Sequence, residues 1–105
     1  MTALERQLTA ALKRHLAGQP PRPPQGAELL WNAFSRLSER RRSGFNGPEA
    51  IAFTEIESFA RLMRMPLEPH HVRAIEAMDR LWLERAVRKP ELPPLSVGAF
   101  DGMRM

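Results

Sequence analysis

The stretch TEIESFARLMRMPLEPHHVRAIEAMDRLWLERAVR, residues 54–88, holds two helical patterns on either side of MPLEP. Apolar residues recur at intervals of three and four in both halves, which is the spacing of one face of an α-helix. Pro69 stands where the first turn of a helix tolerates proline. The stretch therefore predicts two helices, 54–65 and 69–88. Their apolar faces contain Ile56, Phe59, Ala60, Met63, Val72, Ile75, Met78, Trp82, Leu83 and Ala86.

Two further helices are predicted upstream, over residues 27–41 and 2–17. The first has an apolar stripe of Leu30, Ala33, Phe34 and Leu37, with Trp31 beside it. The second has a leucine at every fourth position, with Thr2 as a candidate N-cap and Gly18 as a candidate C-cap. An amphipathic helix this short is marginal alone. We therefore expect residues 2–17 to dock on their own domain or on another chain.

The connecting segments complete an all-α prediction. Residues 1–18 form an N-terminal amphipathic helix, and residues 19–26 form a proline-rich linker that favours an extended path. Residues 27–88 form a small three-helix domain, and residues 89–105 form a flexible tail. In the loop 43–53, Phe45, Ile51 and Phe53 are expected to fold over the core. Thr54 and Glu57 have the spacing of a capping box.

Composition excludes several classes of protein. The chain has 105 residues, which allow one domain at most, and it has no cysteine, so disulfides and thiolate chemistry are absent. No apolar run approaches the length of about 18 residues that a membrane-spanning helix needs. Charges interrupt the N-terminal apolar residues, unlike a signal peptide. We expect a cytoplasmic protein.

The residues that could carry chemistry do not form a recognisable site. His70 and His71 are adjacent, so they point to different faces of a helix, whereas a metal site on a helix needs ligands three or four residues apart. No serine lies in the setting of an activated nucleophile. The prediction is a protein without enzymatic activity, metal or cofactor.

A cluster of arginines is the main signal for an anionic partner. Arg36, Arg40, Arg41 and Arg42 surround the predicted end of the second helix, and the net charge of the chain is +4. Arginine forks match phosphate oxygens. The last helix, however, carries as many acids as bases over residues 67–88, and a neutral helix suits DNA poorly. Nucleic-acid binding or inhibition of a host nucleic-acid machine stays an alternative to protein contact.

An ordered pattern runs through residues 28–84. It comprises a tryptophan helix, a basic stretch, a Gly-Pro loop and the motifs EI..F.RL and PL.P..V..I..MD..WL. Its residues are Trp31, Gly47, Pro48, Glu55, Ile56, Phe59, Arg61, Leu62, Pro66, Leu67, Pro69, Val72, Ile75, Met78, Asp79, Trp82 and Leu83. This pattern resembles the tail assembly chaperone-like proteins of tailed-phage morphogenesis modules. The leucine helix and the proline linker lie outside it.

The resemblance implies a non-enzymatic assembly factor that binds the tape-measure protein or the tail-tube protein, or that associates with itself. A structural component of the virion, such as a connector or decoration, is the other protein-contact interpretation. Amphipathic helices bind partner helices through anchors three and four residues apart. The residues predicted to bind a partner are Leu4, Leu8, Leu12, Leu16, Arg36, Arg40, Arg41 and Arg42.

Overall fold

The computed structural model of the chain describes residues 2–22, 25–88, 93 and 95. In these residues the elements are α1 (Ala3–Leu16), α2 (Glu28–Glu39), β1 (Ser43–Gly44), β2 (Gly47–Pro48), α3 (Phe53–Leu62) and α4 (Pro69–Arg88). The mostly helical prediction is confirmed. The antiparallel hairpin, in which Ser43 pairs with Pro48 and Gly44 with Gly47, is a small addition that no strand pattern indicated.

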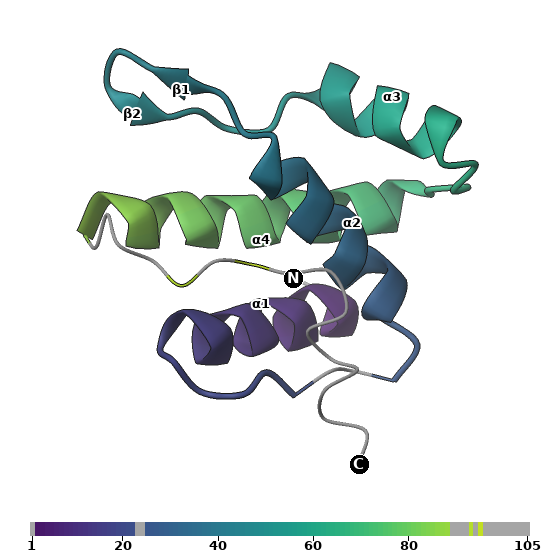
Figure 1. The fold of residues 1–105 in the computed structure, drawn as a ribbon. Helices are drawn as coiled ribbons and strands as arrows, with labels where there is room; N and C mark the ends of the chain where they lie inside the picture. The colour runs from purple at the N-terminus through teal and green to yellow at the C-terminus, as the bar shows by residue number, and fades with distance from the viewer. Residues whose placement is uncertain (1, 23–24, 89–92, 94, 96–105) are drawn as a thin grey trace.

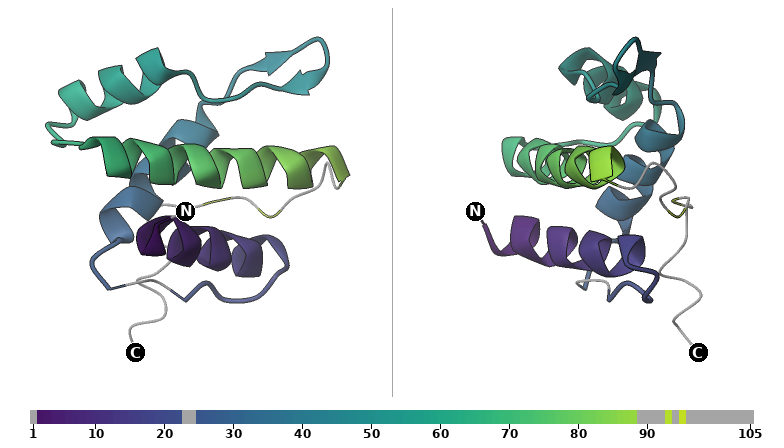
Figure 2. Two further views of the ribbon diagram at one scale, coloured as in Figure 1. Left: turned by 180° about the vertical axis from the view of Figure 1, so that it is seen from behind. Right: turned by 90° about the vertical axis from the view of Figure 1, so that its left-hand side faces the viewer.

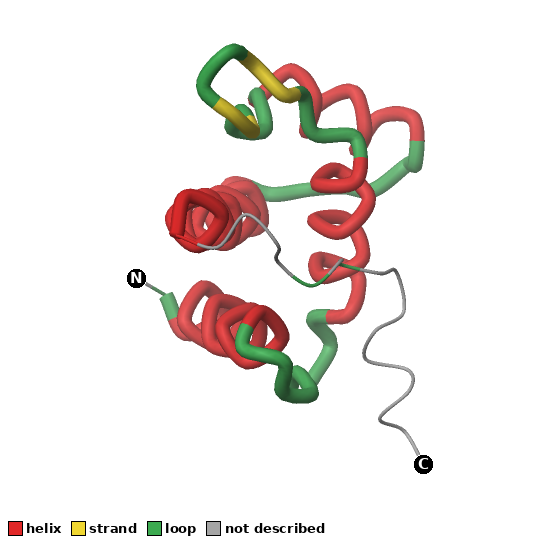
Figure 3. Tube along the Cα trace, turned by 60° about the vertical axis from the view of Figure 1, so that its left-hand side comes forward, coloured by secondary structure: helices red, strands yellow, loops and turns green. Residues whose placement is uncertain are grey.

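Helix α4 is the centre of the arrangement. Helix α1 lies along one side of it and runs in broadly the same direction, whereas α3 and the hairpin lie on the other side (Figure 1). Helix α2 crosses the α1–α4 pair steeply and links the two sides, as the rotated views show (Figures 2 and 3). Helix α2 contacts both α3 and α4, and the core cluster contains residues of all four helices.

The leucine stripe of α1 is part of this core. Leu8 and Leu12 are fully buried and Leu16 nearly so, and α1 packs closely on α4. Of the two expected docking places, the structure therefore shows the chain's own domain. Trp31 and Phe34 of α2 are the largest fully buried side chains. Trp31, which the sequence placed only beside the apolar stripe, lies at the centre of packing.

The ends of α1 follow local chemistry. The Glu5 backbone N–H donates to Thr2 Oγ1 at 3.2 Å, which satisfies one amide that the first turn leaves unpaired. After the last turn, Gly18 adopts φ +82°, a left-handed conformation that glycine takes without steric cost. The predicted N-cap, Thr2, is confirmed, whereas the C-cap is Ala17 and the predicted Gly18 is the residue that follows it.

We expect Thr2→Ala to lower the free energy of unfolding by about 1 kcal/mol, because the cap at Glu5 is lost. Denaturant titration followed by circular dichroism measures this. Thr9→Ala is the matched control, since Thr9 Oγ1 donates to the Glu5 carbonyl within the helix and alanine is the better helix former. An equal loss of stability in both variants would show that the hydrogen bond of the cap makes no specific contribution to the free energy of unfolding.

The loop before α3 differs from its prediction. Phe45 and Phe53 are exposed, so the expectation that they cover the core is wrong, whereas Ile51 does pack on the core. Phe45 occupies the turn of the hairpin, whose tip extends away from α4 (Figure 1). The capping box is also wrong: α3 begins at Phe53 after Ala52, without a side-chain cap, so Thr54 already lies inside the helix.

Most of the predicted tail lies outside the described residues, as do residues 23–24 of the predicted linker. Two of the tail's residues are described. Leu95 is buried and belongs to the core cluster, and Pro93 is half-buried. The chain after α4 therefore contributes at least one apolar side chain to the domain.

Candidate partner-binding surface

Helix α3 is the least buried helix of the described chain. Only Ile56 among its residues is buried. Phe53 at its start, Leu62 at its end and Met63 just after it are exposed large apolar side chains, with Leu62 77% exposed. Exposed apolar groups that cluster on one element are a mark of a contact site, whereas isolated ones need no explanation. We call α3 with these three residues and its two flanking grooves the α3 surface.

The first groove of the α3 surface lies between α3 and the N-terminal half of α4. Its volume is about 780 Å³. Apolar side chains dominate its lining, and charged ones of both signs stand with them. The apolar lining residues are Phe53, Ile56, Ala60, Met65, Pro66, Leu67, Pro69 and Val72, and the charged ones are Glu57, Arg61, Arg73 and Glu76. Such a lining suits an apolar segment that carries a few charges.

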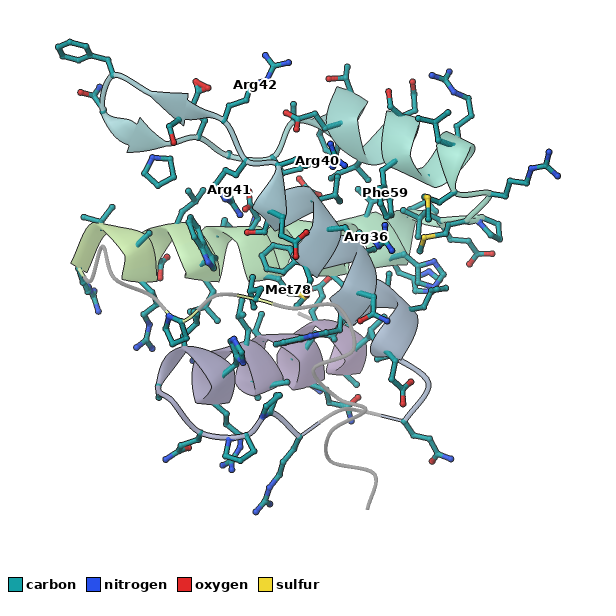
Figure 4. The ribbon with its side chains drawn as sticks, in the orientation of Figure 1. Arg36, Arg40, Arg41, Arg42, Phe59 and Met78 are labelled. Carbon is teal, nitrogen blue, oxygen red and sulfur yellow. The ribbon has the colours of Figure 1, made fainter. Side chains whose placement is uncertain are left out.

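The second groove lies between α2 and α3 and has a volume of about 820 Å³. It brings three of the predicted arginines, Arg36, Arg40 and Arg42, next to Phe59 and Leu62. All three arginines are exposed, and they are labelled with Phe59 in Figure 4. The end of α2 thus places the three arginines in one groove. The carboxylates of Glu39 and Glu55 in the same groove partly offset their positive charge.

Arg41, the fourth arginine, turns inward. Helix α2 ends at Glu39, and the chain then leads into β1. Arg40 is the C-cap, with φ −99° and ψ 16°, and the Arg41 backbone N–H donates to the Ser38 carbonyl at 3.1 Å in a last tight turn. Arg40 and Arg42 are exposed, whereas the side chain of Arg41 is enclosed. Arg41 therefore belongs to the interior and is not part of the exposed α3 surface in this structure.

The guanidinium of Arg41 joins three parts of the chain. Its Nη1 lies 2.6 Å from Asp79 Oδ1, with side chains only 5% and 9% exposed. The same group donates to the Glu49 carbonyl at 2.9 Å and to Ser38 Oγ at 3.1 Å. It also stacks over the Trp82 ring, 4.1 Å from the centroid. Arg41 thus ties the end of α2, the segment after the hairpin and α4 together.

Asp79 is the partner of Arg41, and the sequence did not predict this pair. Its Oδ2 accepts from the Ile51 backbone N–H at 3.0 Å, so the carboxylate holds the loop before α3 as well as Arg41. The signal was available: an aspartate stands beside Met78 within the apolar face of a helix. A charge in such a place is almost always paired. The pair sets where α3 begins and so positions the α3 surface.

The predicted leucines occupy a different part of the molecule. Leu8, Leu12 and Leu16 are buried and Leu4 is half-buried, in the core on the α1 side of α4. The structure therefore does not bring them together with the arginines. A partner reaches these leucines only if α1 leaves α4.

No metal centre is visible among residues 2–22 and 25–88, in which no three His, Cys, Asp or Glu side chains come together. His71 Nδ1 accepts from the Glu68 backbone N–H at 3.0 Å, and His70 Nδ1 lies 3.5 Å from Glu68 Oε2. Both histidines therefore lie in the first turn of α4 and contact Glu68, the residue directly before that helix. None of the helices in this part of the chain has the length and apolar character of a membrane span.

Comparison with known protein families gives a match over residues 6–84 to the phage tail assembly chaperone family. The match begins inside α1, so the leucine helix that the sequence resemblance left out is part of the family pattern, as its burial against α4 suggests. No curated protein and no solved structure matches the chain. Because the family match covers well over half of the sequence, the chain belongs to the phage tail assembly chaperone family.

Proposed function

We propose that this chain binds an amphipathic helix of the tape-measure protein or the tail-tube protein on the α3 surface, in the host cytoplasm, while the tail is built. One observation carries the proposal: Phe53, Leu62 and Met63 are exposed beside two open grooves. A family role in tail assembly calls for contact with another tail protein. Among the described residues, three of the six exposed large apolar side chains belong to the α3 surface.

The energetics favour a helix as the occupant. Burying one large apolar side chain contributes about 1.5–3 kcal/mol. A partner helix has anchors at intervals of three and four residues, so it can fill a groove beside α3 while covering Leu62 or Phe53. The charged side chains of both signs around the grooves then fix orientation and partner choice more than affinity.

This proposal requires no reacting group. An assembly factor of this kind acts by covering the apolar surface of its partner until the tail takes the partner up. Helix α3 is held by the buried Ile56 and the half-buried Phe59, and Asp79 holds Ile51 just before it, so small shifts of this lightly buried helix adjust the width of both grooves. A surface with that freedom suits a partner whose helices are not identical along its length.

We expect Leu62→Glu to reduce co-purification of the tape-measure or tail-tube protein with the tagged chain by at least about tenfold. The substitution removes the apolar contact of Leu62 and introduces a carboxylate that binding must desolvate, and a loss of about 1.4 kcal/mol already corresponds to tenfold. Each partner is co-expressed separately with the chain, so that the two candidates are distinguished.

Val87→Glu is the matched control. Val87 is 84% exposed, close to the 77% of Leu62, but it lies near the end of α4, outside both grooves. It should leave co-purification unchanged. If both variants bind as the wild type does, or if neither partner co-purifies with the wild type, the α3 surface is not the site. A wild-type dimer that Leu62→Glu dissociates would assign the surface to self-association instead.

A further inference from the structure

A third groove, which is lined mainly by charged side chains, runs between α1 and α4. Five cationic side chains line it, and one carboxylate, Glu84, stands among them. Its volume is about 540 Å³. Because α1 and α3 lie on different sides of α4, this groove is separate from the α3 surface (Figure 1). We call it the basic groove. Its cations are Arg6 and Lys13 from α1 and Arg80, Arg85 and Arg88 from α4.

Four cations of the basic groove, Lys13, Arg80, Arg85 and Arg88, are the ones that carry the argument. Lys13, Arg80 and Arg88 are exposed and Arg85 is half-buried. Neither the Arg41–Asp79 pair nor the His70–Glu68 pair involves these four cations. The four cations outnumber Glu84, the one carboxylate in the lining, so the groove keeps a positive charge. A groove of one sign concentrates its field and attracts anions.

The shape of the basic groove limits the size of its ligand. Its α4 wall runs from Ala77 to Arg88, which is about 16 Å at the helical rise per residue. That length accommodates about three turns of a helix. Ala10, Ala77 and Leu81 add small and apolar side chains to the lining, so another backbone can approach closely between the cations.

We propose that the basic groove binds an acidic segment of a protein, a helix of about three turns with carboxylates spaced three and four residues apart. The apolar part of the lining favours a polypeptide, because the apolar side chains of a helix cover it better than a sugar–phosphate backbone does. Glu84 also favours a polypeptide, since its carboxylate repels phosphates but can pair with a lysine or arginine of the segment. This interaction is independent of binding at the α3 surface.

The test is a nuclear magnetic resonance titration of the full chain with a synthetic three-turn alanine-based peptide that carries glutamates at that spacing. A peptide with glutamine in place of glutamate, and a short DNA duplex, are titrated in parallel. We expect the glutamate peptide to shift the backbone amides of residues 6–13 and 77–88. The glutamine peptide should bind at least about tenfold more weakly, as expected when several exposed charge pairs are lost together.

Two triple variants locate the effect. Arg80→Gln with Arg85→Gln and Arg88→Gln should weaken binding of the glutamate peptide about tenfold. Arg36→Gln with Arg40→Gln and Arg42→Gln removes the same charge from the α2–α3 groove and should leave binding nearly unchanged. Equal losses in both variants, or no shifts at residues 6–13 and 77–88, would overturn the proposal. Tighter binding of the duplex than of the glutamate peptide would also overturn it and make the groove a nucleic-acid site.

Discussion

Replacing Asp79 with alanine lowers the free energy of unfolding by about 3–5 kcal/mol, because it removes one partner of a buried ion pair. The Arg41 guanidinium, whose side chain is 5% exposed, stays enclosed with no carboxylate beside it. The Ile51 backbone N–H loses its acceptor in the same step. A loss of this size is a large part of the total stability of a small domain. Denaturant unfolding followed by circular dichroism measures it.

Two variants control the Asp79 experiment. Glu84→Ala removes an equal charge from an exposed position on the same helix and should change stability by less than about 0.5 kcal/mol. Arg41→Met combined with Asp79→Leu removes both charges and should recover most of the loss, since apolar replacements of a buried pair are often neutral. If Asp79→Ala and Glu84→Ala unfold at the same denaturant concentration, the Arg41–Asp79 pair does not stabilise the fold.

Replacing Trp31 with alanine costs about 3–5 kcal/mol as well, through the cavity that a deleted buried aromatic leaves. Trp31 is fully buried in α2, and its ring is nearly perpendicular to the His15 ring, with 5.6 Å between the centroids. The side chain therefore joins α2 to the last turn of α1. We expect the melting transition of the variant to be broad or absent, and calorimetry of the full chain measures it.

Trp82→Ala is the matched comparison for Trp31. The sequence predicts Trp82 as a core residue whose loss unfolds the domain, but Trp82 is half-buried and its ring covers the Arg41 guanidinium. Its replacement therefore removes less buried area and should destabilise the chain less than Trp31→Ala does. The reverse order of the two melting temperatures would place the centre of the core at α4 and not at α2.

Helical periodicity was a good guide to the elements of this chain. Helix α4 begins and ends where its apolar spacing and Pro69 predict, and α1 agrees to within a residue at each end. The errors concern contacts between elements. Phe45 and Phe53 are as apolar as Phe34, and they are exposed because of the path of the hairpin and of the start of α3. A pattern within one element contains no information about which face another element will cover.

Contacts between elements also limited the prediction of the candidate site. Four arginines were predicted as one cluster because they are close together in the sequence at the predicted end of the second helix. The chain after Glu39 instead directs Arg41 to Asp79 in the interior and leaves Arg40 and Arg42 exposed. The basic groove escaped prediction because its cations come from α1 and α4, which are far apart in the sequence. Only the packing of these helices brings the cations together.

Hydrogen–deuterium exchange of the chain, alone and in complex with the tape-measure or tail-tube protein, tests the proposed binding mode most directly. Binding at the α3 surface predicts slower exchange over residues 53–67 and unchanged exchange over residues 3–16, because α1 stays packed on α4. Binding through Leu4, Leu8, Leu12 and Leu16 would require α1 to leave α4. Altered exchange in α1 with no change in α3 would therefore contradict the account.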